Sequence, residues 1–126
     1  MAKKESVLEE KSQAFALRIV KLYRHLRENH ESVMAKQILR SGTSIGANIA
    51  EGNYAQSRDD FASKFGIALK EAAETRYWLV LLLKGGFVED DAAYQSLHAD
   101  CEELIRMLVA SVKTVKANGF WYNEGN

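Results

Sequence analysis

Apolar residues recur along this chain at alternating steps of three and four, the period of an amphipathic helix that buries one face. Four such runs predict helices over about residues 6–28, 32–52, 58–84 and 90–117, followed by a tail at 118–126. No stretch shows the two-residue alternation of a strand, and no segment of 20–50 residues repeats. The pattern therefore predicts an all-α protein that forms one domain over residues 1–126.

Short joints separate the predicted helices. Ser32 and Ser57 precede the second and third helices as candidate N-caps, and Gly85-Gly86 ends the third. Successive helices joined by short loops pack as antiparallel neighbours. The sequence thus predicts an up-down-up-down antiparallel four-helix bundle.

The second helix has an unusual composition over residues 40–52, RSGTSIGANIAEG. A flexible loop and a phosphate-binding loop are the alternatives to a helix. The helical spacing of Ile38, Ile45 and Ile49 argues against a loop, and a phosphate loop needs a Lys-Ser/Thr pair after its glycines. We therefore predict a helix. Its small residues recur every four positions and would let another backbone come close, either in the same bundle or in a neighbouring subunit: Gly42, Gly46 and Ala50.

A row of polar residues follows the same helix. With a carboxylate from the third helix, it predicts a structural polar network within the bundle or between protomers: Ser41, Ser44, Asn48, Glu51 and Glu74. The alternative is a di-metal carboxylate site, but that pattern needs Glu-x-x-His on two helices, and Glu71-Ala72-Ala73-Glu74 ends in Glu.

Other candidate chemistry is sparse. His25 and His30 lie about 140° apart around a helix and cannot face one ligand, and His98 has no metal-binding partner at ligand spacing. Cys101 falls on the core stripe of the fourth helix, which favours a packed thiol over a nucleophile. We expect no catalytic residue, no metal and no cofactor.

Composition fits an ordinary globular protein, with 47% hydrophobic and 27% charged residues and no proline. A single cysteine, no apolar leader and no long apolar run predict a cytoplasmic protein without a membrane segment. Net charge is zero, yet residues 1–40 carry nine Lys/Arg against five Asp/Glu. A basic stripe on the first helix is the candidate nucleic-acid contact, although an ordinary solvated helix face, with lysine stems lying beside the core, is the favoured alternative. The stripe residues are Lys11, Arg18, Lys21 and Arg24.

Some apolar residues lie off the core stripes and predict a surface for another copy of the chain; the alternative is a wide core in a small monomer. These candidate interface residues are Val20, Tyr23, Ile67, Trp78 and Leu81. Beyond the last helix, Phe120-Trp121-Tyr122 could stack on bases or dock into a neighbouring groove.

Several motifs carry a family resemblance over roughly residues 10–115. They are Arg40-Ser41-x-x-Ser44-Ile45-x-x-Asn48-Ile49-x-Glu51-Gly52, then Asp60-Phe61, then Ile67-Ala68-Leu69-Lys70-Glu71-Ala72-x-Glu74-Thr75-x-Tyr77-Trp78-Leu79. The chain resembles the bacterial four-helix-bundle proteins encoded in intervening sequences of 23S ribosomal RNA genes. It is more distantly similar to accessory variability proteins of diversity-generating retroelements, which bind nucleic acid and a reverse transcriptase. Those relatives are strongly basic, and this chain is neutral. Many relatives have Gly-Ser in place of Lys70-Glu71.

The resemblance implies a bundle that assembles into a homo-oligomeric ring, commonly a homopentamer, and it transfers no catalytic residue. We expect a non-enzymatic scaffold or interaction protein. The alternative is an RNA-binding accessory protein whose partner is RNA or an RNA-associated protein and whose contact is the first-helix stripe. An enzyme would instead need a pocket lined by Glu51 and Glu74.

Overall fold

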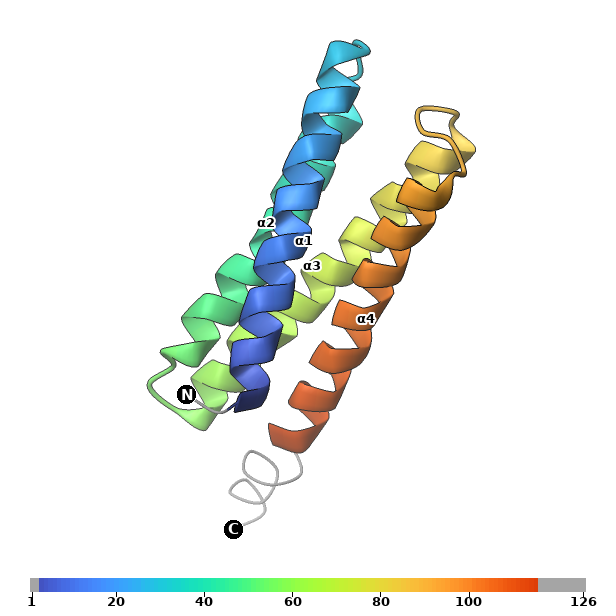
Figure 1. Cartoon of the computed structure of the whole chain (residues 1–126). Coiled ribbons are helices and arrows are strands. Elements are labelled where there is room, and N and C mark those ends of the chain that lie inside the picture. Colours follow the sequence, from blue (N-terminus) through green and yellow to red (C-terminus); the bar gives the residue numbers. More distant parts are fainter. Residues whose placement is uncertain (1–2, 116–126) are drawn as a thin grey trace.

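The computed structural model describes residues 3–115 and contains four α-helices: α1 (Lys3–Glu28), α2 (Val33–Asn53), α3 (Arg58–Lys84) and α4 (Ala92–Val115). Within that range no residue lies in a strand, so the predicted all-α class with four helices is confirmed. The predicted end of the fourth helix and the tail at 118–126 lie outside the described residues. Figure 1 shows the α1–α2 and α3–α4 joints at one end and the α2–α3 joint at the other.

Local hydrogen bonds set where the helices begin. Ser57 accepts from the backbone N–H of Asp60 at 3.0 Å and caps α3, as its position predicts. Ser32 makes no side-chain cap; instead the Glu31 carboxylate accepts from the Met34 N–H at 2.6 Å, so α2 begins at Val33. Asp91 accepts from the Tyr94 N–H at 2.8 Å, which starts α4 two residues after the predicted position.

Two residues with positive φ turn the chain at the same end of the molecule. His30 has φ 67° in the α1–α2 joint, and Gly86 has φ 80° after α3. At Gly86 the turn is closed by a hydrogen bond of 2.9 Å from the Phe87 N–H to the Leu82 carbonyl. The left-handed conformation suits glycine, so Gly86 ends α3 without strain.

The four helices enclose one hydrophobic core. Each helix packs against the next along the chain, and α1 also meets α4, although this last contact is the smallest. The predicted stripes supply the core, whose largest fully buried side chains include Phe15, Ile19, Ile45, Phe65 and Leu104. Some stripe residues, such as Leu22 and Phe61, are half-buried and pack against this core.

The small residues of α2 contact helices of the same chain. A Cβ at Gly42 would lie 2.8 Å from Cγ2 of Ile19, and one at Gly46 would lie 3.2 Å from Oγ of Ser12, both on α1. On the opposite flank a Cβ at Gly52 would lie 2.5 Å from the ring of Phe65 on α3. Ala50, the third predicted small residue, is half-buried. The sequence left open whether the backbone of α2 is approached by its own bundle or by a neighbouring subunit. At Gly42, Gly46 and Gly52 the approaching residues belong to the same chain.

We predict opposite effects for one substitution at two helical glycines. Gly42→Ala adds a methyl against branched atoms of Ile19, and overpacking of this kind should lower the free energy of unfolding by about 1–3 kcal/mol. Gly66→Ala is the matched control, because a Cβ there meets nothing within 4 Å. Its better helix propensity should raise stability by up to about 1 kcal/mol. Urea unfolding followed by circular dichroism measures both; equal stabilisation by the two variants would refute the close approach.

Candidate functional site

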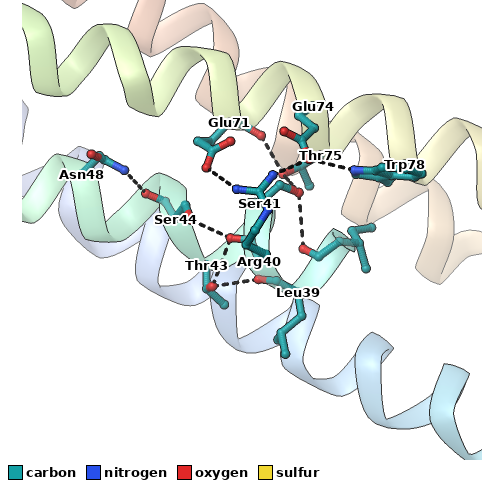
Figure 2. A network of polar contacts seen from close by, with 11 residues as sticks. Leu39, Arg40, Ser41, Thr43, Ser44, Asn48, Glu71, Glu74, Thr75 and Trp78 are labelled. Atoms are coloured by element: carbon teal, nitrogen blue, oxygen red, sulfur yellow. Dashed lines mark hydrogen bonds and ion pairs between the residues drawn. The ribbon is translucent and has the colours of Figure 1, made fainter. Parts of the chain in front are cut away.

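The most connected polar cluster lies on the seam between α2 and α3 (Figure 2). Arg40 reaches from α2 to two carboxylates of α3: its Nη1 donates to Glu71 at 2.8 Å, and its Nη2 donates to Glu74. Trp78 completes the cluster, because its indole Nε1 donates to the same Glu74 oxygen at 3.0 Å. We call these four residues the arginine clamp.

The hydrogen bonds of the clamp favour its charged forms. Donation from Trp78 and then from Arg40 holds the pKa of Glu74 below its ordinary value. Hydrogen bonds to the two carboxylates raise the pKa of Arg40, and the bond to Glu74 has a larger effect than the bond to Glu71. A carboxylate held ionised between two donors is a poor general acid or base near neutral pH. The cluster is suited to fixing α2 against α3.

A buried pair of hydroxyl groups lies beneath the clamp. Ser41 and Thr75 are both fully buried, and their oxygens form a hydrogen bond of 2.9 Å across the seam. The Glu71 carbonyl lies 2.8 Å from the Thr75 oxygen, and the Ile38 carbonyl lies 3.5 Å from the Ser41 oxygen. Both hydroxyl protons therefore have acceptors inside the chain, as burial of polar groups requires.

Of the other members of the predicted polar network, Ser44 and Asn48 form hydrogen bonds within α2, whereas Glu51 reaches α3 away from the clamp. The Ser44 hydroxyl donates to the Arg40 carbonyl at 2.6 Å, and the Asn48 amide donates to the Ser44 carbonyl at 2.9 Å, so both bonds stay within α2. Glu51 lies apart, 58% exposed, with its carboxylate 3.3 Å from the Lys64 ammonium. The five predicted residues thus fall into four groups: Ser41 in the hydroxyl pair, Glu74 in the clamp, Ser44 with Asn48 along α2, and Glu51 with Lys64.

Sequence reasoning missed the partners that organise the seam. Arg40 stood only in the family motif, and Glu71 stood there and in the rejected di-metal pattern. Thr75 also belonged to the apolar stripe of the third helix, and Trp78 also stood among the interface candidates. A usable signal was present, because Ser41 and Thr75 are polar residues on facing core stripes. Arg40 is 51% exposed, and a long exposed side chain gives no periodicity by which its partner could be predicted.

Two of the four residues in the predicted basic stripe form ion pairs with α4. The Arg18 guanidinium donates to Asp100 at 2.7 Å and to Ser96 at 3.1 Å. Lys11 lies 3.2 Å from Glu103. Lys21 and Arg24 are exposed and form no ion pair within residues 3–115. The stripe therefore presents two unpaired cations to a phosphate backbone rather than four.

The candidate interface residues differ in how much surface they offer. Tyr23 and Trp78 pack against the core of their own chain, while Val20 and Leu81 are half-buried. Ile67 is 41% exposed. The structure adds Tyr77, 58% exposed, whose ring meets that of Trp78 edge-on at 5.1 Å. Helical spacing places a set of these residues, which we call the outer row of α3, on its outward side: Ile67, Tyr77, Trp78 and Leu81.

The remaining reactive groups are buried or scattered. Cys101 is fully buried, and burial raises the pKa of its thiol to about 12, which keeps it protonated. His25, His30 and His98 do not meet in space: across residues 3–115, no three His, Cys, Asp or Glu side chains are grouped to hold a metal ion. No helix of the described part is long and apolar enough to cross a bilayer.

Comparison with models of protein families shows which family this four-helix chain belongs to. The model of the 23S rRNA-intervening sequence proteins matches residues 4–110, which include all the seam residues. The chain belongs to this family. The arginine clamp and the small residues of α2 both lie within the part of this intervening sequence protein that matches the family model.

One solved structure is similar to this intervening sequence protein over nearly its whole length. It is the crystal structure of a protein of unknown function from the S23 ribosomal protein family of Bacteroides thetaiotaomicron, with 51% sequence identity and a TM-score of 0.84. The match covers 87% of this chain and 98% of that one. A search of curated proteins finds no match.

We predict that the arginine clamp makes stability depend on pH in the acid range. The folded pKa of Glu74 lies below its ordinary value of 4.5, so its stabilisation is complete above that value and is lost as pH falls through the folded pKa. Glu74→Gln should remove this part of the acid sensitivity, about 1 kcal/mol or less because the pair is partly exposed. Urea titrations at pH 7, 5, 4 and 3 measure it, with exposed Glu28→Gln as control. Parallel stability profiles for wild type and Glu74→Gln would contradict the assignment.

Proposed function

We propose that this protein is a non-enzymatic scaffold whose up-down-up-down antiparallel bundles assemble into a homo-oligomeric ring. The observation that carries the proposal is the outer row of α3. Ile67 and Tyr77 are 41% and 58% exposed, although the bundle has a complete core of its own. Exposed apolar side chains clustered on one helix face are typical of a surface that another protein covers.

A second copy of the chain is the partner that this surface fits best. The outer row lies on a helix without a neighbour on that side, and a closed ring would bury the same surface in every subunit. The family resemblance supports five subunits. In keeping with a structural role, the polar groups of the seam have their partners within the chain, and the Cys101 thiol stays protonated.

Nucleic-acid binding receives less support from the contacts. Two of the four predicted stripe cations, Lys11 and Arg18, pair with carboxylates of α4. A neutral chain with two remaining stripe cations offers little of the counterion release that drives nonspecific binding. We therefore propose self-association rather than RNA binding as the main activity.

Light scattering after size exclusion at micromolar concentration tests the assembly. We expect a mass five times the protomer mass of 14.2 kDa. Ile67→Glu places a charge in the outer row and should shift the mass toward the protomer, whereas Ala99→Glu, on an exposed site of α4, should leave it unchanged. Circular dichroism verifies that both variants fold. A wild-type protein that is monomeric at this concentration would overturn the proposal.

A further inference from the structure

A groove lies between α1 and α4 and is lined in part by the α3–α4 joint. Figure 1 shows this joint at the end of the molecule opposite the C-terminal end of α4. Its volume is about 850 Å³, within the range of sites that hold a small ligand or a few side chains. Leu22, Leu79, Tyr94 and Leu97 form an apolar floor, and Phe87 stands at the mouth with 43% of its surface exposed.

The two sides of the groove carry opposite charge. The cations on the α1 side are Arg18, which pairs with Asp100, and Lys21, which has no ion-pair partner within the described helices. Glu89 and Asp91 line the side of the α3–α4 joint, where Asp91 is engaged as the cap of Tyr94. An occupant with an apolar body and one carboxylate would satisfy the floor and the unpaired cation together.

The chain itself contains a segment of this chemistry beyond α4. Phe120, Trp121 and Tyr122 are consecutive aromatics, and Glu124 follows two residues later. Aromatic side chains bury about 150–250 Å² each, so three of them provide a substantial apolar contact. In an extended segment, Glu124 would lie about 7 Å beyond Tyr122, near enough for its carboxylate to meet a cation at the rim.

Distance excludes the tail of the same molecule as occupant. Tyr94 lies 21 residues before Val115 in α4, which is about 32 Å along the helix. Phe120 to Tyr122 lie five to seven residues after Val115, and a fully extended chain of that length spans at most about 18–25 Å. Phe120, at most about 18 Å from Val115, falls short of Leu97, about 27 Å away, and of Tyr94. The aromatic triplet as a whole therefore cannot cover the floor of its own groove.

We propose that the Phe120-Trp121-Tyr122 segment of one copy docks into the α1–α4 groove of another copy, with Glu124 facing Lys21. The inference rests on the proposed self-assembly and deepens it, because it names a second contact between subunits besides the outer row of α3. A ring joined by two contacts tolerates the loss of either one better than a ring joined by one.

Photocrosslinking with the full-length chain tests the docking. Tyr122→p-benzoylphenylalanine should, on irradiation, link two chains, and mass spectrometry should place the links at Phe87, Val88 or Lys21. A mixture of isotopically light and heavy protein shows whether each link joins different chains. Lys113→p-benzoylphenylalanine, exposed in the last turn of α4, is the matched control and should give no link to the groove.

Groove variants sharpen the test. Phe87→Asp should lower the Tyr122 crosslink yield about tenfold, as loss of an aromatic anchor does at interfaces, and Tyr54→Asp, 83% exposed on the α2–α3 joint, should not. An oligomer whose Tyr122 crosslinks fall outside the groove or within one chain overturns the docking and leaves the assembly standing. A monomer without intermolecular crosslinks overturns both.

Discussion

Helix α2 contacts α1 and α3 at the same time, and it can do so because it carries little side-chain volume on the two flanks that meet them. Gly42 and Gly46 admit Ile19 and Ser12 of α1, while Gly52 admits the ring of Phe65 from α3. Glycines inside a helix cost about 1 kcal/mol each relative to alanine, and here close packing offsets that cost. Helix α2 thus connects α1 to α3 on one side of the bundle, and α4 packs against both on the other.

Polar contacts then fix how far each helix slides along its neighbour. The Ser41–Thr75 hydrogen bond and the arginine clamp hold α2 to α3, and Arg76 to Glu102, at 3.0 Å, holds α3 to α4. Exposed ion pairs of this kind add little stability, but a buried hydroxyl pair penalises any other register. These groups satisfy one another within the chain, so the contacts of the seam hold α2 against α3.

The apolar periodicity of the sequence was sufficient to predict four helices and nearly every core residue. It was also sufficient to read residues 40–52 as a helix with close contacts, since Ile38, Ile45 and Ile49 keep their spacing through the glycines. Periodicity could not show which helices the glycines contact. Small residues lie on both flanks of α2, and either flank could have faced its own bundle or a neighbouring subunit. Nor could periodicity predict the partners of Arg40 or Arg18, since long exposed side chains choose among several carboxylates only once the helices are in place.

The outer row of α3 and the α1–α4 groove have a common structural cause. The core is complete within four helices, yet Ile67 and Tyr77 on α3 and Phe87 beside the α1–α4 groove stay exposed. Of the contacts between neighbouring helices of the bundle, that between α1 and α4 is the smallest, and it coincides with the groove. A bundle that is tight around α2 and open opposite it would present fixed, rigid surfaces for assembly.

A double-mutant cycle on the buried hydroxyl pair tests most directly whether the seam is an internal packing element. Ser41→Ala and Thr75→Val each remove one partner and should each lower the free energy of unfolding by about 1–2 kcal/mol. The double variant leaves no unpaired hydroxyl, so its loss should fall short of the sum by at least about 0.5 kcal/mol. Losses that simply add would contradict the account, because they would mean that Ser41 and Thr75 do not serve each other across the seam.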